Sequence, residues 1–129
     1  MKLEVVATGK APKAVGPYVQ GVKAGGFLFT AGQVGLDPAT GKLVEGGIEA
    51  ETRRVLENLQ AVVEAAGGSF AQVVKTTVYL TDLNDFQTMN RIYATFFTGQ
   101  SPARSTVGVA RLPLGALVEI EMVALVDKG

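Results

Sequence analysis

Two stretches of the chain place apolar residues at helical spacing, with charged or polar residues between them. The first runs from residue 48 to 66, and Gly67 stands where such a helix would end. The second follows Asp82 to Asp85, whose side chains are typical helix caps, and ends at Gly99. These patterns predict two helices, and we interpret the aromatic stripe of the second as core. The stripes consist of Ile48, Thr52, Val55, Leu56, Leu59, Val62, Val63 and Ala66, and of Phe86, Met89, Tyr93, Phe96 and Phe97.

The other apolar segments are short and bounded by turn residues, and several are rich in β-branched or aromatic residues, which predicts strands. A hairpin turn is expected at Lys23 to Gly26. Three strands, a helix, a strand, a helix and two strands follow in order. This order predicts an α+β fold with a mixed sheet and both helices packed on one face. We expect a single domain over residues 1–129. The predicted strands are Leu3 to Ala7, Tyr18 to Val22, Phe27 to Ala31, Val73 to Leu80, Ser105 to Ala110 and Leu117 to Val126.

The last predicted strand carries apolar residues on both of its faces. Val118, Ile120, Met122 and Ala124 alternate with Leu117, Glu119, Glu121, Val123 and Leu125. If both helices cover one face of the sheet, the second apolar face needs another cover. We therefore expect a partner subunit on that face, with the two glutamates near the interface.

The composition removes several kinds of chemistry. The chain has no cysteine and no histidine, which excludes disulfides, thiolate nucleophiles, the usual general base and the commonest metal ligand. Twelve basic residues balance twelve acidic ones, so no overall positive field would attract nucleic acid. The N-terminus has no apolar run of signal-peptide length and no segment approaches a membrane span, so we expect a cytoplasmic protein.

Arg104 is the first candidate functional residue, because it follows the rigid Pro102 at the mouth of a predicted strand. Its planar guanidinium matches a carboxylate or phosphate two hydrogen bonds at a time, and it stays charged at physiological pH. This suits a binding group and not a proton carrier. A surface arginine beside a loop is the other interpretation of the same segment.

Glu119 and Glu121 lie two residues apart on a predicted strand and so share a face. Such a pair is either a place for acid–base chemistry or an ordinary solvated strand face. We expect the strands that begin at Ser105 and Leu117 to pair with each other. That pairing would bring Arg104 and the glutamates into one cleft suited to a small anionic substrate and a water molecule.

Six motifs follow one another over nearly the whole chain. They are Ala14-Val15-Gly16-Pro17-Tyr18-Val19-Gln20-Gly21, Thr30-Ala31-Gly32-Gln33, Val74-Lys75-Thr76-Thr77-Val78-Tyr79-Leu80, Pro102-Ala103-Arg104-Ser105, Ala110-Arg111-Leu112-Pro113 and Glu119-Ile120-Glu121. Together they resemble the reactive intermediate deaminase A family, also called the YjgF family. The resemblance implies a chorismate-mutase-like α+β subunit that assembles as a homotrimer, with clefts between neighbouring subunits.

The resemblance also implies an activity. Members of the family hydrolyse enamines and imines of 2-keto acids, such as 2-aminoacrylate, and are 2-iminobutanoate/2-iminopropanoate deaminases that release a 2-keto acid and ammonia. In this interpretation Arg104 grips the substrate carboxylate, while Glu119 holds and partly deprotonates the attacking water. No metal or organic cofactor is required, because an imine is already electrophilic.

Four further residues would line the cleft in the same interpretation. Backbone N–H groups near Gly32 and Thr106 would add hydrogen bonds to the substrate. Tyr18 and Asn90 would form walls, although Tyr18 taken alone equally suits a packed core aromatic. The chain departs from the commonest family pattern at Thr106, where many members have cysteine, and at Ala31, where some have serine. Both changes bear on pocket shape and substrate range.

Two other functions stay open. Some relatives are described as endoribonucleases or translation inhibitors, but zero net charge and the absence of histidine speak against a nucleic-acid enzyme. A non-catalytic trimer could use the Arg104 clamp to sense a keto acid. Binding without turnover would look the same in sequence.

Overall fold

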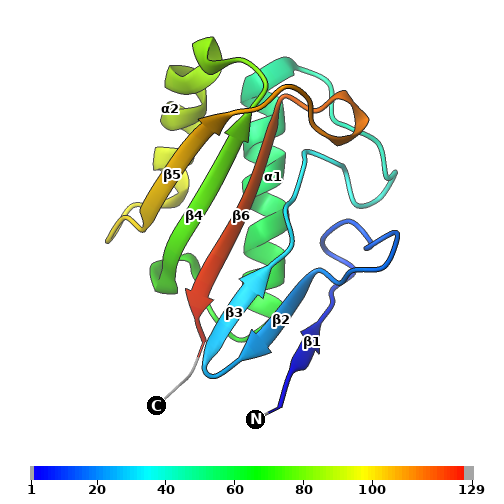
Figure 1. Cartoon of the computed structure of the whole chain (residues 1–129), viewed down its shortest axis with the longest axis vertical. Coiled ribbons are helices and arrows are strands. Elements are labelled where there is room, and N and C mark those ends of the chain that lie inside the picture. Colours follow the sequence, from blue (N-terminus) through cyan, green and yellow to red (C-terminus); the bar gives the residue numbers. More distant parts are fainter. Residues whose placement is uncertain (1, 127–129) are drawn as a thin grey trace.

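The computed structural model describes residues 2–126, which form a six-stranded mixed sheet with two helices on one face (Figure 1). Across the sheet the strands follow the order β1-β2-β3-β6-β4-β5. The α+β class and the placement of both helices, predicted from the sequence, are confirmed. The elements are β1 (Glu4–Val6), β2 (Gly21–Ala24), β3 (Phe27–Thr30), α1 (Gly47–Ala65), β4 (Val73–Leu80), α2 (Phe86–Phe96), β5 (Ala103–Gly108) and β6 (Val118–Leu125), with short 3-10 turns at Phe70–Gln72, Leu83–Asp85 and Pro113–Gly115.

The connections between elements explain the strand order. β1, β2 and β3 form an antiparallel meander, and β4, α2 and β5 form a crossover unit that leaves β5 parallel to β4 at the sheet edge. β6 then lies antiparallel between β3 and β4. The expected pairing of the strands near Ser105 and Leu117 is therefore wrong, because β4 separates β5 from β6.

The face of the sheet that meets the helices forms the core. Every second residue of β6 points there, and none of these residues is more than 2% exposed. α1 lays its predicted stripe against them, and each large apolar side chain buried in this way contributes about 1.5–3 kcal/mol. The buried residues of this interface include Val118, Ile120, Met122 and Ala124 from β6 and Val55, Leu56, Leu59, Val62 and Val63 from α1.

The opposite face of the sheet is open. Phe27 and Phe29 of β3 lie on it beside Leu125 of β6, with 38%, 48% and 41% of their surface exposed. The prediction that the last strand is apolar on both faces is thus confirmed. No other segment of residues 2–126 covers this face, which we call the open face (Figure 1).

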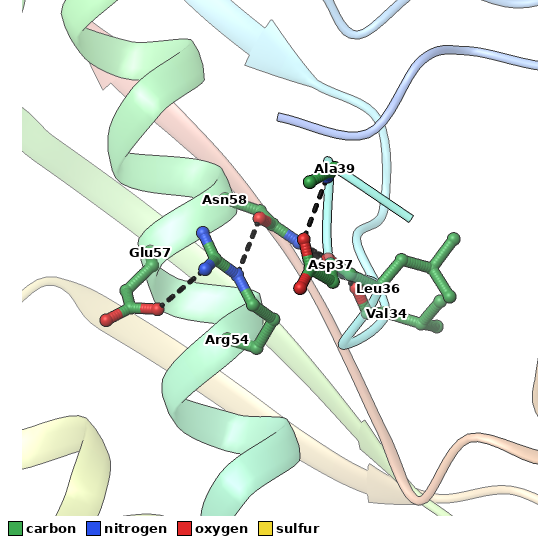
Figure 2. A network of polar contacts seen from close by, with 7 residues as sticks. All are labelled: Val34, Leu36, Asp37, Ala39, Arg54, Glu57 and Asn58. Atoms are coloured by element: carbon green, nitrogen blue, oxygen red, sulfur yellow. Dashed lines mark hydrogen bonds and ion pairs between the residues drawn. The ribbon is translucent and has the colours of Figure 1, made fainter. Parts of the chain in front are cut away.

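A buried asparagine holds the segment after β3 against α1 (Figure 2). The Asn58 side-chain nitrogen donates to the Leu36 carbonyl at 3.0 Å and to the Val34 carbonyl at 3.4 Å. Arg54 donates to the Asn58 side-chain oxygen at 3.0 Å and forms an ion pair with Glu57 at 3.2 Å. Asn58 is fully buried, so partners on both its oxygen and its nitrogen are what its burial requires. The network fixes the course of the chain between β3 and α1.

β1 and β6 begin one residue later than predicted, and two other strands, β2 and β5, begin two or three residues from the predicted positions. β2 starts later because Gln20 holds the preceding loop with its own side chain. That side chain accepts from the Thr8 N–H at 2.7 Å and donates to the Pro12 carbonyl at 2.8 Å. β5 starts earlier because its ladder with β4 already pairs Ala103 with Lys75. Strand ends depend on such tertiary partners, which hydrophobic alternation does not reveal.

Candidate active site

Arg104 lies on the helix-facing side of β5, because the ladder pairs it with the buried Thr76 of β4. Its guanidinium carbon is 4.8 Å from the centre of the Tyr93 ring and 5.5 Å from that of Phe86, both on α2. Such cation–π contacts hold a long charged side chain in place. Within residues 2–126 no carboxylate forms an ion pair with Arg104. Its donors are therefore available to an anionic ligand.

Two hollows lie between α2 and β5, and we call them together the α2–β5 groove. Arg104 lines the first, and Phe86, whose ring lies under the guanidinium, lines the second. The first has a volume of about 500 Å³ and is lined by Asn90, Tyr93, Ala94, Phe97, Ser101, Pro102 and Arg104. The second has a volume of about 480 Å³ and is lined by Leu83, Asn84, Phe86, Gln87 and Thr106. Each hollow is of the size that holds small metabolites.

Two buried polar atoms in this groove have no partner within residues 2–126. They are the side-chain oxygen of Asn90 and the hydroxyl of Thr106. Buried polar groups in proteins are nearly always hydrogen-bonded, so orphaned ones beside a free guanidinium suit a polar ligand. The groove thus brings together three of the predicted site residues, namely Arg104, Asn90 and Thr106.

Tyr93 forms a wall of the groove. Its hydroxyl is already engaged in a hydrogen bond, so it is not a candidate for proton transfer to a ligand. Its hydroxyl and the Thr76 hydroxyl form a buried hydrogen bond of 2.8 Å. Burial raises the pKa of Tyr93, against the lowering effects of Thr76 and Arg104. The phenol therefore stays neutral at physiological pH.

Glu119 lies on the open face, where β6 meets the segment that follows β3. Burial raises the pKa of its carboxyl, and the negative charge of Glu121 raises it further. Gly32 lies directly against this carboxyl. A Cβ at that position would come within 2.9 Å of the Glu119 Cδ, closer than carbon atoms pack. Gly32 is held there because the N–H of Gln33 donates to the Ile120 carbonyl at 2.9 Å.

Tyr79 lies beside the glutamates on the open face, and the sequence interpretation missed it. The β4–β6 register places Tyr79 directly opposite Glu119. Burial raises the pKa of Tyr79, as do the charge of Glu121, a hydrogen bond to Glu121 and the charge of Glu119. On the same face Lys75 donates to the Ser105 hydroxyl at 3.1 Å. The alternation along β4 could have placed Tyr79 on this face, but its partner strand had to be known first.

Tyr18 is not a core residue, because 53% of its surface is exposed. Its N–H donates to the Gly16 carbonyl at 2.9 Å, which folds the loop into a tight turn. Two residues later, the Gln20 carbonyl accepts from the Ala31 N–H at 2.9 Å. This bond ties the loop of Tyr18 to the end of β3, beside Gly32.

The predicted site residues therefore form two groups on opposite sides of the sheet. The expectation that one chain brings Arg104 and Glu119 into a single cleft is wrong. β4 lies between their strands, and the ladders place Arg104 opposite a helix-facing residue and Glu119 opposite an open-face residue. The groups are Arg104, Asn90 and Thr106 in the α2–β5 groove, and Glu119 and Gly32 on the open face, with the loop of Tyr18 joined to the latter.

Residues 2–126 contain no cluster of three or more acidic side chains that could hold a metal ion. No helix in this range is both long enough and apolar enough to cross a membrane. Arg104 is instead the group that suits an organic anion.

A family model described as Endoribonuclease L-PSP matches residues 8–126 of the chain. The chain belongs to this family. Its members include proteins named Reactive Intermediate Deaminase A, so the resemblance to the YjgF family is confirmed. The 2-iminobutanoate/2-iminopropanoate deaminase of Mus musculus is 51% identical over 122 residues, which cover 95% of this chain and 90% of the mouse protein. A RutC family protein of Pyrococcus horikoshii is 54% identical over 121 residues, 94% of this chain and 96% of that protein.

Solved structures of this family have the same fold. The YjgF gene product of E. coli superimposes with a TM-score of 0.92 at 46% identity, over 96% of this chain and 99% of its own. E. coli TdcF, whose structure contains bound serine, also has a TM-score of 0.92, at 44% identity over 96% of this chain and 99% of its own. Family members thus carry both endoribonuclease and deaminase names on one fold, so the site has to distinguish the two functions.

Proposed function

We propose that this protein is a hydrolase that deaminates 2-iminobutanoate and 2-iminopropanoate, which form from enamines such as 2-aminoacrylate. The observation that carries the proposal is Arg104, a permanent cation without a carboxylate partner among residues 2–126, set on two aromatic rings beside orphaned polar atoms. The deaminase names of relatives support it. So does the serine bound to TdcF, because serine also carries a carboxylate next to a carbon–nitrogen bond.

Substrate binding follows from the α2–β5 groove. The Arg104 fork donates two parallel hydrogen bonds to the substrate carboxylate, and the Asn90 oxygen and Thr106 hydroxyl supply further polar contacts. The aromatic rings behind Arg104 limit the motion of its side chain, so the carboxylate is held in one orientation.

The chemical step follows from Glu119. Its ionised carboxylate accepts a proton from a water molecule while the water oxygen bonds to the imine carbon. Glu119 passes this proton to the imine nitrogen, which gives the carbinolamine. The carbinol hydroxyl then loses its proton, which is transferred to the nitrogen by way of Glu119, the carbon–nitrogen bond breaks, and the carbinol oxygen becomes the keto oxygen as ammonia leaves. A raised pKa makes the Glu119 carboxylate a stronger base for the first transfer, and the proton that it gains there is the one it passes to nitrogen. Gly32 leaves room for the carboxylate to do this.

The two groups of residues meet when copies of the chain assemble. We propose a homotrimer in which the open face is covered by neighbouring copies, so that the α2–β5 groove of one subunit faces Glu119 of the next. The half-exposed phenylalanines Phe27 and Phe29 support this, because an apolar sheet face favours association. Tyr18 would then form a wall of the shared cleft. Light scattering at micromolar concentration should give the mass of three chains, and a monomer would contradict the shared cleft.

Ammonia release from freshly generated 2-aminoacrylate, with and without the protein, tests the activity. We expect clear acceleration over the spontaneous reaction and competitive inhibition by small 2-keto acids. Keto-acid binding without acceleration would instead identify a sensor. RNA cleavage by highly purified protein that is lost in Arg104 or Glu119 variants, without any imine hydrolysis, would identify a nuclease.

Subunit mixing tests whether each cleft uses two copies. Arg104→Lys and Glu119→Gln chains are separately impaired, but a mixed trimer contains clefts that combine the native Arg104 of one chain with the native Glu119 of another. Random reassembly from equal amounts should restore about one quarter of native activity. Each cleft has a chance of about one half of receiving a native Arg104 and, independently, about one half of receiving a native Glu119. Mixing without reassembly is the control and should restore none. No recovery after verified reassembly would show that one chain supplies both residues.

A further inference from the structure

Glu51 is a buried residue near the start of α1 that the proposed reaction does not use. Only 4% of its surface is exposed, although glutamate is seldom buried so fully unless it is paired. Its Oε1 atom accepts a hydrogen bond of 2.8 Å from the backbone N–H of Leu117, which is 66 positions away in the chain. The carboxyl is therefore buried with a backbone partner, and this partner stands two residues before Glu119.

Leu117 is the point at which the chain enters β6. Its carbonyl accepts from the N–H of Thr81, just after β4, at 3.2 Å. Both backbone groups of Leu117 are thus engaged, one by Glu51 and one by Thr81. Because the side chains of a strand alternate in direction at a fixed rise, the backbone held at Leu117 sets where the Glu119 side chain leaves the sheet.

The loop before Leu117 does little to fix the strand that follows. Its tip, Pro113–Gly115, is exposed. Leu114 has a φ of +61°, a left-handed conformation that is unfavourable for a residue with a Cβ. An exposed and strained loop cannot place β6 by its own packing, so the contact from Glu51 provides a fixed point at its end.

The same part of α1 also packs against the segment after β3, which lies beside the Glu119 carboxyl. A Cβ at Gly35 would come within 3.0 Å of the Glu51 Cα and 3.1 Å of the Glu51 carbonyl oxygen. Two residues before Gly35, Gln33 exchanges two backbone hydrogen bonds with Ile120, of 2.9 Å and 3.1 Å. Glu51 therefore contacts both stretches of backbone that place the Glu119 carboxyl, the start of β6 and the segment after β3.

We propose that Glu51 is a positioning residue for Glu119. Its carboxyl oxygen holds the start of β6, so that the Glu119 carboxylate stands at the working distance from a substrate bound by Arg104 of a neighbouring copy. The inference rests on the proposed deaminase function. Glu51 acts through the backbone and does not touch the substrate. What matters is then an acceptor oxygen at the reach of a glutamate side chain, and not the negative charge.

Two variants separate the oxygen from the charge. Glu51→Gln removes the charge but keeps an acceptor oxygen at the same reach, so kcat for ammonia release should stay within about twofold of native. Glu51→Asp keeps the charge but shortens the side chain by one methylene, so the Leu117 N–H loses its partner and kcat should fall by about tenfold. Because Arg104 is unchanged, calorimetric binding of pyruvate should stay within about twofold of native in both variants.

Thr52→Val is the matched control for packing. Thr52 is the next residue of α1 and is fully buried, and its hydroxyl has no partner within residues 2–126. The variant changes the same buried stretch of helix without removing a contact to β6, so kcat should stay within about twofold of native. Equal losses of kcat in Thr52→Val and Glu51→Asp would identify helix packing as the cause and overturn the proposal.

Amide hydrogen exchange, followed by NMR, provides a measurement that does not depend on activity. In Glu51→Asp the amides of Leu117 and Ile120 should exchange about tenfold faster than in the native protein. The amide of Val109, which donates to the Leu80 carbonyl at 2.8 Å at the other end of the loop, should be unchanged.

Three results would overturn the role of Glu51. They are unchanged exchange at Leu117 in Glu51→Asp, a native kcat in that variant, and a larger loss in Glu51→Gln than in Glu51→Asp. A parallel loss of pyruvate binding would also overturn it, because it would show a general disturbance of the fold. No ammonia release by the native protein would overturn the proposed function, and the exchange at Leu117 and Ile120 would still decide whether Glu51 holds this backbone.

Discussion

The α2–β5 groove and the open face differ in every property that matters for binding a charged substrate. The groove offers a guanidinium on aromatic rings, with orphaned polar atoms nearby. The open face offers two carboxylates, a phenol with a raised pKa, and exposed phenylalanines. One region attracts an anion and the other repels it. We therefore expect the groove to bind the carboxylate of the substrate. Only the imine carbon and nitrogen would then approach the open face.

This division keeps two reactive groups from neutralising each other. If Arg104 contacted Glu119 within one chain, the guanidinium would lower the pKa of the carboxyl and the carboxylate would occupy the fork. Opposite faces of the sheet prevent that contact in the folded subunit. In the proposed assembly, the substrate carboxylate accepts the Arg104 hydrogen bonds that a glutamate side chain would otherwise accept.

The largest expected effect lies on the open face. Glu119→Gln keeps the shape of the side chain but removes the base, so turnover should fall by about 1000-fold. Binding of a 2-keto acid such as pyruvate, measured by calorimetry, should stay within about twofold because the groove is untouched. Glu121→Gln should retain most of the native rate. A reversed ranking would mean that the other glutamate of the pair is the base.

The next largest effect lies in the groove. Arg104→Lys keeps the charge but loses the planar fork, so kcat/KM should fall by about 100-fold. Unlike the Glu119 variant, this one should also bind 2-keto acids more weakly. Circular dichroism and light scattering should show native folding and assembly. Activity within about twofold of the native protein would show that no bidentate carboxylate contact matters.

A smaller effect is expected from the glycine that faces Glu119. Gly32→Ala introduces a methyl group where the Glu119 carboxyl lies, so the carboxyl must move and turnover should fall by about tenfold. Gly9→Ala is the matched control, because a Cβ there meets nothing within 4 Å. Equal activity in the two variants would show that the position of the carboxyl is not critical.

The smallest effect concerns the rings behind Arg104. Phe86→Leu removes one cation–π contact, which should weaken 2-keto-acid binding by about threefold in calorimetry. Phe96→Leu changes the same residue type on the same helix, where the ring packs beside Phe70 and not beside Arg104. It should leave binding unchanged, and equal losses in both variants would point to helix packing as the cause.

Several features of this protein were predictable because they depend on neighbours along the chain. The strand Val73–Leu80 has the predicted bounds, and α1 ends before Gly67, whose φ of +91° suits glycine. The two-sided apolar pattern of β6 correctly indicated an open face. Arg104 was named from its place after Pro102 at the mouth of a strand, and Asn90 and Thr106 were named from the family resemblance. The groove then brought the three together.

Other features were not predictable from local patterns. The pairing of β5 with β4 arises from the crossover through α2, and it overturned the expected cleft between neighbouring strands. The exposure of Tyr18 depends on Gln20, which holds the preceding loop by side-chain hydrogen bonds. The position of Tyr79 opposite Glu119 depends on register. A shift of one residue in that ladder would send Tyr79 to the core face.

By itself, the sequence determined which segments are helices or strands, which side of each is apolar, and which residue types are available for chemistry. These properties follow from periodicity and composition, which are local. Only the tertiary structure decided that Arg104 and Glu119 face opposite sides of the sheet, and that Gly32 and Tyr79 lie beside the glutamates. The reason is physical: strand order and register are set by crossovers and by contacts between residues far apart in the chain, and each register shift exchanges the two faces.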